Sequence, residues 1–249
     1  MKKALYDTIG KDYVLGRRTD PRIAAEIHRW LQGAESVLNL GAGSGSYEPP
    51  DCRVAAVEPS ETMIRQRPAT SAPAIRAQAE NLPFPGAAFS HCMTVLSMHH
   101  WQDREKAFAE IRRVTRKRFV AVTWDPEAEP FWLTRDYFPE LVSLDRTNFP
   151  TIDELSRAFA KISVNTLPIP ADCIDGFLAA YWRRPEAYLD ERVRNNISTF
   201  SKISDVESGL AQLAADLKSG AWESRNQADL KLDAIDVGYR VICADLTSP

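Results

Sequence analysis

The sequence predicts an α/β fold with a seven-stranded, mostly parallel sheet covered by helices on both faces, and a helical cap inserted before the last strand. Short apolar segments alternate with amphipathic ones over the first half of the chain. That alternation is typical of a parallel sheet whose crossovers are helical. A glycine-rich turn follows the first apolar segment, and a long stretch of helical periodicity separates the last two strand candidates.

The composition is that of an ordinary globular protein. The chain has 249 residues, of which 44% are hydrophobic and 26% charged, and its net charge is −3. This charge gives no reason to expect a nucleic acid or a membrane as partner. Its four cysteines lie far apart without a C-x-x-C pair, which argues against a zinc or redox motif, and we expect no metal site. Without a signal peptide or an 18-residue apolar run, the predicted location is cytoplasmic.

The first half contains five strand candidates. A helix is expected before these strands, with Asp20 as its cap and Pro21 at its first position. About a dozen residues separate the first two strands, so we expect the first crossover helix to be short or absent. A basic run at 112–118 is interpreted as the solvated end of a helix. The expected strands are 36–40, 53–57, 74–77, 91–96 and 119–124, and the expected helices between them are 60–67 and 104–115.

The second half is less regular. Residues 126–150 are rich in aromatic residues and proline, which predicts an ordered covering loop. A capping box of Thr151 and Glu154 predicts a helix over 151–161. Strands are expected at 162–169 and 237–244, with helices at 206–217 and 223–232 between them. The predicted division is an arm and helix at 1–34, a sheet domain at 35–170 and 236–249, and a cap at 171–235.

The glycine-rich turn predicts a nucleoside ligand. Gly41, Gly43 and Gly45 follow the strand at alternate positions, and Glu58 comes 17 residues after Gly41. Glycine lets a ligand approach the backbone, and an acid at this spacing suits the hydroxyls of a ribose. The pattern is G-x-G-x-G, and Glu48 with two prolines occupies the place of a phosphate-facing helix, which disfavours a dinucleotide. A plain turn between two strands is the structural alternative.

Four segments, in their order and spacing, resemble a known family. Residues 37–45, 54–60, 77–84 and 94–101 are similar to the motifs of class I S-adenosylmethionine-dependent methyltransferases, of the small-molecule, type-11-like kind. The resemblance implies a Rossmann-like sheet, S-adenosyl-L-methionine as cofactor, S-adenosyl-L-homocysteine as product and a small-molecule substrate.

The resemblance also implies which residues bind the cofactor. The glycine turn would lie against the methionine part and the ribose, Glu58 would accept from both ribose hydroxyls, and the segment around Ala79 would follow the adenine. The arm at 6–18 would close over the cofactor, with Arg17 on its carboxylate. Asn39 and Gln78 stand where the family usually has acids. The implied cofactor residues are Tyr13, Arg17, Asn39, Gly41, Ala42, Gly43, Gly45, Glu58, Pro59, Gln78, Ala79, Glu80 and Leu96.

Two histidines follow the fourth expected strand, at the edge where open α/β sheets bind ligands. The ordinary pKa of histidine suits proton removal from a hydroxyl or an ammonium, so His99 and His100 are the catalytic candidates. The alternative is that one of them is packed under the loop. Aromatic residues on the neighbouring loops and in the cap are candidates for a substrate pocket. They are Trp101, Trp132, Tyr137, Tyr181 and Trp182, with Trp124, Phe131 and Phe138 close by in the sequence.

These residues predict methyl transfer to an oxygen or nitrogen nucleophile of a small organic molecule. One alternative is a cofactor-binding protein of the same fold without transferase activity, which acts in regulation or partner binding. Another is an NAD-dependent oxidoreductase, which needs a pyrophosphate site. The expected assembly is a monomer or a homodimer.

Overall fold

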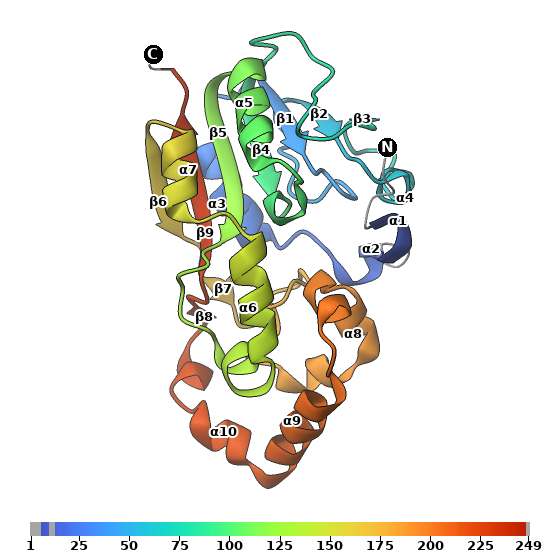
Figure 1. The fold of residues 1–249 in the computed structure, drawn as a ribbon, viewed down its shortest axis with the longest axis vertical. Coiled ribbons are helices and arrows are strands. Elements are labelled where there is room, and N and C mark those ends of the chain that lie inside the picture. Colours follow the sequence, from blue (N-terminus) through green and yellow to red (C-terminus); the bar gives the residue numbers. More distant parts are fainter. Residues whose placement is uncertain (1–5, 10–12, 248–249) are drawn as a thin grey trace.

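The computed structural model describes residues 6–9 and 13–247, which form a seven-stranded sheet flanked by helices and extended by a helical cap (Figure 1). The strand order is β3-β2-β1-β4-β5-β9-β6, with β9 antiparallel to both of its neighbours. This confirms the predicted α/β fold. The strands are β1 (Ser36–Leu40), β2 (Arg53–Val57), β3 (Ala74–Ile75), β4 (Phe89–Val95), β5 (Thr115–Trp124), β6 (Ile162–Thr166) and β9 (Tyr239–Asp245).

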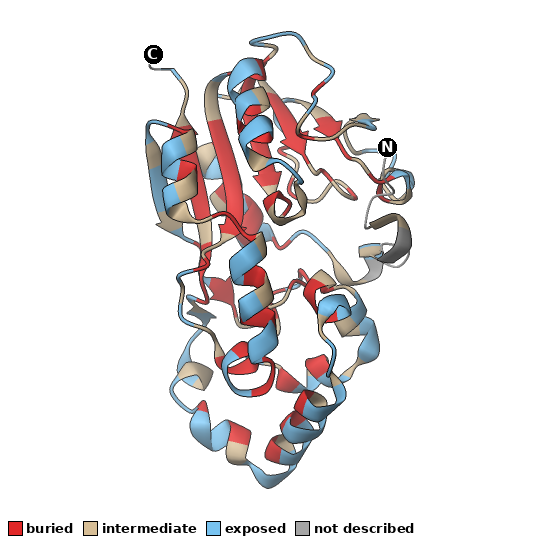
Figure 2. Ribbon diagram, in the orientation of Figure 1, coloured by how far each residue is buried: buried red, intermediate tan, exposed pale blue. Residues whose placement is uncertain are grey.

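The central strands are buried on both faces. Residues that alternate along β1 point to opposite sides, so Val37 packs with helix α3 (Pro21–Trp30) and Leu38 packs with α5 (Arg104–Val114) and α7 (Ile152–Ala158). Figure 2 shows the resulting band of buried residues through the sheet. Continuous apolar strands of this kind require helices on both faces, because neither face can be left to water.

The first crossover has no helix. The chain passes from β1 to β2 through turns, as the short spacing predicted, and the next crossover carries only α4 (Glu61–Arg65). Ser60 caps α4 by accepting a hydrogen bond from the backbone N–H of Met63. Two short helices of the N-terminal arm, α1 (Tyr6–Ile9) and α2 (Tyr13–Gly16), lie on this side of the sheet, with α1 against α4 (Figure 1).

Several expected element boundaries are corrected. Helix α5 ends at Val114 and β5 begins at Thr115, so the basic run is divided between a helix and a strand. The cause is the β4–β5 ladder, which extends as far as the pair Phe89 and Thr115. The strand expected at 162–169 is split, because Pro168 has no N–H for a ladder. The helix expected at 223–232 is α10 (Ala221–Arg225) followed by a 3₁₀ turn, η5 (Asp229–Lys231).

The segment 126–150 is also corrected, because most of it is helical. A π-helical turn, η2 (Leu133–Tyr137), leads into α6 (Pro139–Asn148), where Pro139 occupies the first turn. Their side chains share one core with those from residues 188–222. The sequence between β6 and β9 supplies the other cap elements. They are β7 (Ile169–Pro170), η3 (Pro185–Leu189), α8 (Glu191–Asn195), η4 (Ser198–Lys202), α9 (Glu207–Ser219), α10, η5 and β8 (Ala234–Ile235).

Two properties hold for the part of the chain that the structure describes. None of its helices is long and apolar enough to cross a membrane. Within the same residues, no group of three or more histidine, cysteine, aspartate or glutamate side chains is arranged to hold a metal ion.

Candidate functional site

The glycine turn lies at the carboxyl ends of β1 and β4. Gly41 has a φ of 63°, and a Cβ added to it would lie 2.4 Å from Oγ of Ser97 in the turn after β4. The two turns therefore approach each other so closely that the position requires glycine. Ser97 is itself held by its neighbours, with Thr94 Oγ1 at 2.6 Å from its hydroxyl.

Glu58 is a buried carboxylate at the end of β2, with an exposed fraction of 5%. Its Oε2 accepts from the backbone N–H of Gly43 at 2.9 Å, and its Oε1 accepts from that of Ser60 at 2.9 Å. Burial raises its pKa, and these two N–H groups partly offset that effect. Within residues 6–9 and 13–247 it forms no ion pair, so each oxygen keeps a lone pair for a ligand hydroxyl.

A cavity of about 490 Å³, called the larger cavity below, opens beside Glu58. It is lined by the predicted cofactor residues Tyr13, Gly41, Gly43, Glu58, Pro59, Gln78, Ala79, Glu80 and Leu96, together with His99, His100 and Trp101. The cavity, the close backbone approach at Gly41 and the spare acceptors of Glu58 fit a bound nucleoside of the size of S-adenosylmethionine.

Four predicted cofactor residues lie outside the lining of the larger cavity. Asn39 donates from Nδ2 to Oε1 of Glu48 at 3.1 Å. Ala42 and Gly45 lie within the turn, where Gly45 N–H donates to the carbonyl of Ala42 at 2.9 Å. Arg17 is engaged by Asp175 and by the Tyr13 hydroxyl. Their assigned roles in cofactor binding stay predictions.

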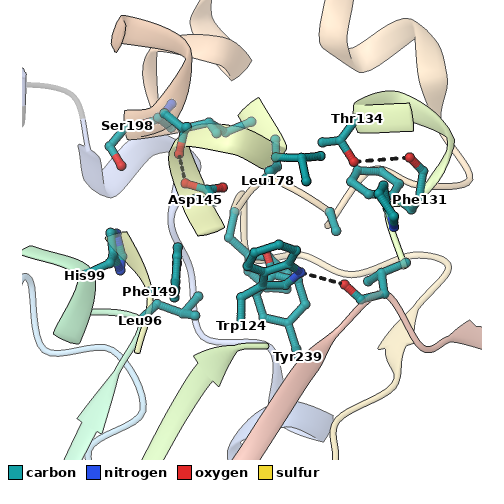
Figure 3. Close-up of a pocket in the computed structure, with 18 of the residues that line it drawn as sticks. Leu96, His99, Trp124, Phe131, Thr134, Asp145, Phe149, Leu178, Ser198 and Tyr239 are labelled. Atoms are coloured by element: carbon teal, nitrogen blue, oxygen red, sulfur yellow. Dashed lines mark hydrogen bonds between the residues drawn. The ribbon is translucent and has the colours of Figure 1, made fainter. Parts of the chain in front are cut away.

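A smaller cavity of about 60 Å³ lies between the strand ends and the cap. Tyr6, Leu96 and His99 line both cavities, so the two spaces meet at these side chains. Figure 3 shows the smaller cavity with Leu96, Trp124 and Tyr239 on the sheet side, and with Asp145, Leu178, Thr134 and Ser198 on the side of the cap.

The two histidines differ in position. His99 lies at the junction of the cavities, stacked on Phe149 with 4.2 Å between ring centroids, whereas His100 lines the larger cavity only. Burial lowers the pKa of His99 well below its ordinary value and that of His100 to about 3. Both rings are therefore neutral near pH 7. Nδ1 of His99 is buried and has no hydrogen-bond partner among the described residues, while Nε2 of His100 lies 3.4 Å from the Tyr6 hydroxyl.

The predicted substrate aromatics are mostly placed elsewhere. Trp132 and Tyr137 belong to the core of the cap, where their burial against other rings stabilises the fold. Trp182 donates from Nε1 to the carbonyl of Ile169 at 2.9 Å. Tyr181 lines neither cavity, and Trp101 lines the larger one. Besides Tyr6 and His99, the rings that line the smaller cavity are Trp124, Phe131, Phe149, Phe177 and Tyr239.

Asp145 is a site residue that the sequence analysis missed. It lines the smaller cavity from α6, is 7% exposed, and its Oδ1 accepts from the Thr199 hydroxyl at 3.1 Å. Burial raises its pKa to about 6. The signal was present in the sequence, because Leu141, Val142 and Asp145 share one face of a helix. It was hidden by the interpretation of this segment as a loop.

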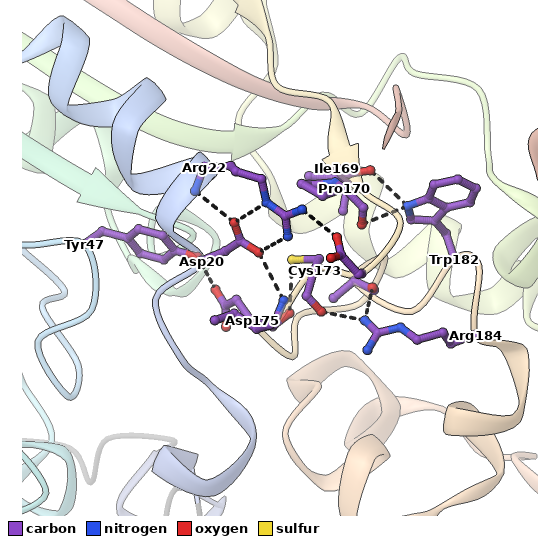
Figure 4. Close-up of polar contacts among 12 residues, drawn as sticks. Asp20, Arg22, Tyr47, Ile169, Pro170, Cys173, Asp175, Trp182 and Arg184 are labelled. Carbon is purple, nitrogen blue, oxygen red and sulfur yellow. Dashed lines mark hydrogen bonds and ion pairs between the residues drawn. The ribbon is translucent and has the colours of Figure 1, made fainter. Parts of the chain in front are cut away.

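A buried polar network joins Asp20 at the start of α3 and Tyr47, just after the glycine turn, to the start of the cap segment (Figure 4). Arg17 connects the arm to it through Asp175. Asp175 accepts from the Tyr47 hydroxyl at 2.7 Å and from Nε of Arg17 at 2.6 Å. Asp20, the cap of α3, accepts from the backbone N–H of Ile174 at 3.1 Å. The network positions the arm beside both cavities.

Comparisons with known proteins agree with this geometry. A family model described as a methyltransferase domain matches residues 38–121. A curated chloroplastic 2-methyl-6-phytyl-1,4-hydroquinone methyltransferase 2 of Oryza sativa subsp. japonica is 34% identical over 83 residues, which is 33% of this chain. The match spans only 22% of the length of that relative.

Two solved structures extend the comparison. A protein of Anabaena variabilis, described as a methyltransferase from an antibiotic biosynthesis pathway, is 33% identical with a TM-score of 0.85, over 92% of this chain and 98% of that one. Geranyl diphosphate C-methyltransferase of Streptomyces coelicolor, solved with Mg²⁺, geranyl diphosphate and S-adenosylhomocysteine, is 16% identical with a TM-score of 0.50. The match covers 89% of this chain and 77% of the Streptomyces chain, and the two proteins share the fold.

Proposed function

This chain belongs to the class I S-adenosylmethionine-dependent methyltransferases, and from that premise we propose that it moves the methyl group to an oxygen or nitrogen nucleophile of a small organic molecule. S-adenosylmethionine is its cofactor, and S-adenosylhomocysteine is the product that remains. The observation that carries the proposal is the smaller, aromatic-lined cavity, which meets the larger one at Tyr6, Leu96 and His99. A small acceptor in that space would lie next to the cofactor.

We assign the larger cavity to the cofactor. Glu58 would accept from the ribose hydroxyls, and Gln78, Ala79 and Glu80 would line the adenine, as the cavity lining supports. When bound, the cofactor supplies an activated methyl group on a sulfonium, so the protein has to align the reactants and exclude water.

We assign His99 the task of orienting the acceptor. A neutral imidazole has an acceptor nitrogen that takes a hydrogen bond from a hydroxyl or an amine. The lowered pKa keeps this ring neutral near pH 7 and makes it a weak base, which suits a positioning hydrogen bond better than complete proton transfer. The cap, packed over the strand ends, would keep water out of the junction.

Other assignments stay proposals of the same kind. We propose that residues 35–170 and 236–249 form the cofactor-binding domain, that 171–235 form a cap over the acceptor, and that 1–34 are its arm and first helix. We propose a cytoplasmic monomer or homodimer without a nucleic acid or membrane partner, in line with the net charge of −3.

The test is a product assay. Purified protein, S-adenosylmethionine and a panel of small phenols, alcohols and amines should give a product heavier by one methyl group, whose position is then assigned by NMR. His99→Gln should lower kcat much more than it weakens the binding of S-adenosylhomocysteine. Methylation at carbon would contradict the proposed nucleophile. Binding of S-adenosylhomocysteine without any product over the whole panel would favour a cofactor-binding protein without transferase activity.

A further inference from the structure

Asp145 lines the smaller cavity at a position where its charge stabilises neither its own helix nor the core. Asp145 lies in the last turn of α6, where the helix dipole disfavours a negative charge. It is 7% exposed, and its side chain accepts a hydrogen bond from the Thr199 hydroxyl. Within residues 6–9 and 13–247 no lysine or arginine forms an ion pair with it. A buried carboxylate in this state destabilises the protein unless a ligand supplies the missing charge.

The surroundings of Asp145 leave its charge largely uncompensated. Lys202 on η4 is exposed and acts only at a distance, and Arg17 in the cavity wall is already paired with Asp175. His99 is neutral because burial lowers its pKa, and Glu129 at the exposed rim adds a second negative charge. The cavity therefore favours a positive ligand.

Aromatic rings line the cavity opposite this carboxylate. Figure 3 shows Trp124 and Tyr239 at the strand ends facing the cap side, where Asp145 lies, with Phe149 beside them. Trp124 and Phe149 are in edge contact, with 5.8 Å between ring centroids. Indole, phenol and phenyl rings attract a cation through their faces, most strongly where water is excluded.

We propose that the small-molecule acceptor carries a cationic amine, which enters this cavity and is held by the Asp145 carboxylate among the rings of Trp124, Phe149 and Tyr239. The inference rests on the proposed function in that it treats the occupant of the smaller cavity as the methyl acceptor. It deepens that function by naming the charge of the acceptor, and it makes Asp145 the residue that selects it. Where this nitrogen itself takes the methyl group, the ammonium first gives one N–H proton to the Asp145 carboxylate, and its lone pair then displaces S-adenosylhomocysteine from the methyl group.

The test compares three probes of one shape and different charge. 2-Phenylethylamine, 2-phenylethanol and phenylacetate are titrated into the protein saturated with S-adenosylhomocysteine, at pH 7.5, by calorimetry. The amine should bind at least about tenfold more tightly than the alcohol, because a hydrogen bond to a charged partner is stronger than one between neutral groups. Phenylacetate should bind more weakly than both.

Variants connect the preference to the carboxylate. Asp145→Asn keeps the size and an acceptor for Thr199 while it removes the charge, so the affinities for amine and alcohol should come within about threefold of each other. Thr199→Val keeps the charge and should keep the preference. Glu140→Gln is the matched control, because Glu140 is an exposed acid on the same helix, and the preference should be unchanged.

The outcomes separate this inference from the proposed function. An alcohol that binds as tightly as the amine, an amine preference that survives Asp145→Asn, or no binding of any probe overturns the amine site. The amine site is also overturned if 2-phenylethanol is methylated and the Asp145→Asn variant methylates it at an unchanged rate. In that case the proposed methyl transfer to oxygen stands. Amine binding that depends on Asp145, without any methylated product, leaves the amine site in place and contradicts the proposed transfer.

Discussion

Arg17 and Asp175 form a buried two-pronged ion pair between the N-terminal arm and the segment that follows β7. Nε of Arg17 lies 2.6 Å from Oδ1 of Asp175, Nη2 lies 3.3 Å from Oδ2, and the side chains are 12% and 2% exposed. Nη1 of Arg17 donates to the Tyr13 hydroxyl at 2.8 Å, which brings the arm against the larger cavity. The pair thus couples the position of the arm to that of the cap segment.

Asp175→Asn should destabilise the protein strongly. Removal of one partner leaves the Arg17 guanidinium buried without its counter-charge, which costs about 3–5 kcal/mol of unfolding free energy in comparable pairs. Asp172→Asn is the control, because Asp172 is 82% exposed in its pair with Arg22, and little change is expected. Urea unfolding at pH 7 measures both. Equal losses of unfolding free energy in the two variants would contradict the larger contribution assigned to the buried pair.

Gly41→Ala should combine a strained backbone with a steric clash. The residue has a φ of 63°, and the new Cβ would lie 2.4 Å from Oγ of Ser97. Gly33→Ala tests the backbone alone, since Gly33 has a φ of 78° and nothing within 4 Å of the added Cβ. Each should lose about 1 kcal/mol through φ, and Gly41→Ala should lose more and weaken S-adenosylhomocysteine binding. Adding Ser97→Gly to Gly41→Ala should restore part of the lost stability, because it removes the atoms that the new Cβ would contact. If the double variant is no more stable, the steric clash is not the cause.

Glu58→Gln should weaken the binding of S-adenosylhomocysteine by about tenfold to a hundredfold. The amide replaces one acceptor oxygen by a donor, which then faces a backbone N–H, and it removes the charge that strengthens hydrogen bonds from the ligand. Glu61→Gln, at an exposed acid in the first turn of α4, should bind normally. Calorimetry of the two variants beside the unaltered protein decides, and unchanged affinity in Glu58→Gln would remove this carboxylate from the cofactor site.

The half-buried histidine at position 100 should make the protein less stable in acid. Its pKa of about 3 in the folded protein lies below the ordinary 6.5, so the unfolded chain binds the proton first as the pH falls. The contribution of this group to stability is therefore complete above pH 6.5 and decreases toward pH 3, with a loss of about 3 kcal/mol by pH 4. His100→Gln should lose less stability between pH 7 and pH 4. Parallel pH profiles for both proteins would contradict the assignment.

Asp145 should have the opposite effect on stability. Its pKa of about 6 lies above the ordinary 3.8, so the folded protein holds the proton more firmly, and stability decreases as the pH rises from 4 through 6. Asp145→Asn should remove that penalty and raise the unfolding free energy by about 3 kcal/mol at pH 7.5, with little gain at pH 4. Thermal unfolding at both pH values measures the difference. A variant less stable than the unaltered protein at pH 7.5 would show that the charge supports the fold.

The sequence by itself determined the sheet and the cofactor edge of the site. Apolar runs such as 36–40, the glycines at 41 and 43, and Glu58 are close in the chain, and their spacing expresses local backbone requirements. A strand followed by such a turn places these groups at one edge of a parallel sheet, whatever packs beyond it. The segments that line the larger cavity could therefore be predicted from the sequence alone.

Only the tertiary structure decided the acceptor side. The walls of the smaller cavity come from Leu96, Asp145, Ser198 and Tyr239, which are brought together by packing between the sheet and the cap. The aromatic content of 126–150 did not show which rings enter the core and which line a space, because burial depends on partners distant in sequence. The same holds for Arg17, whose charge could serve a ligand or the fold until Asp175, 158 positions along the chain, was placed beside it.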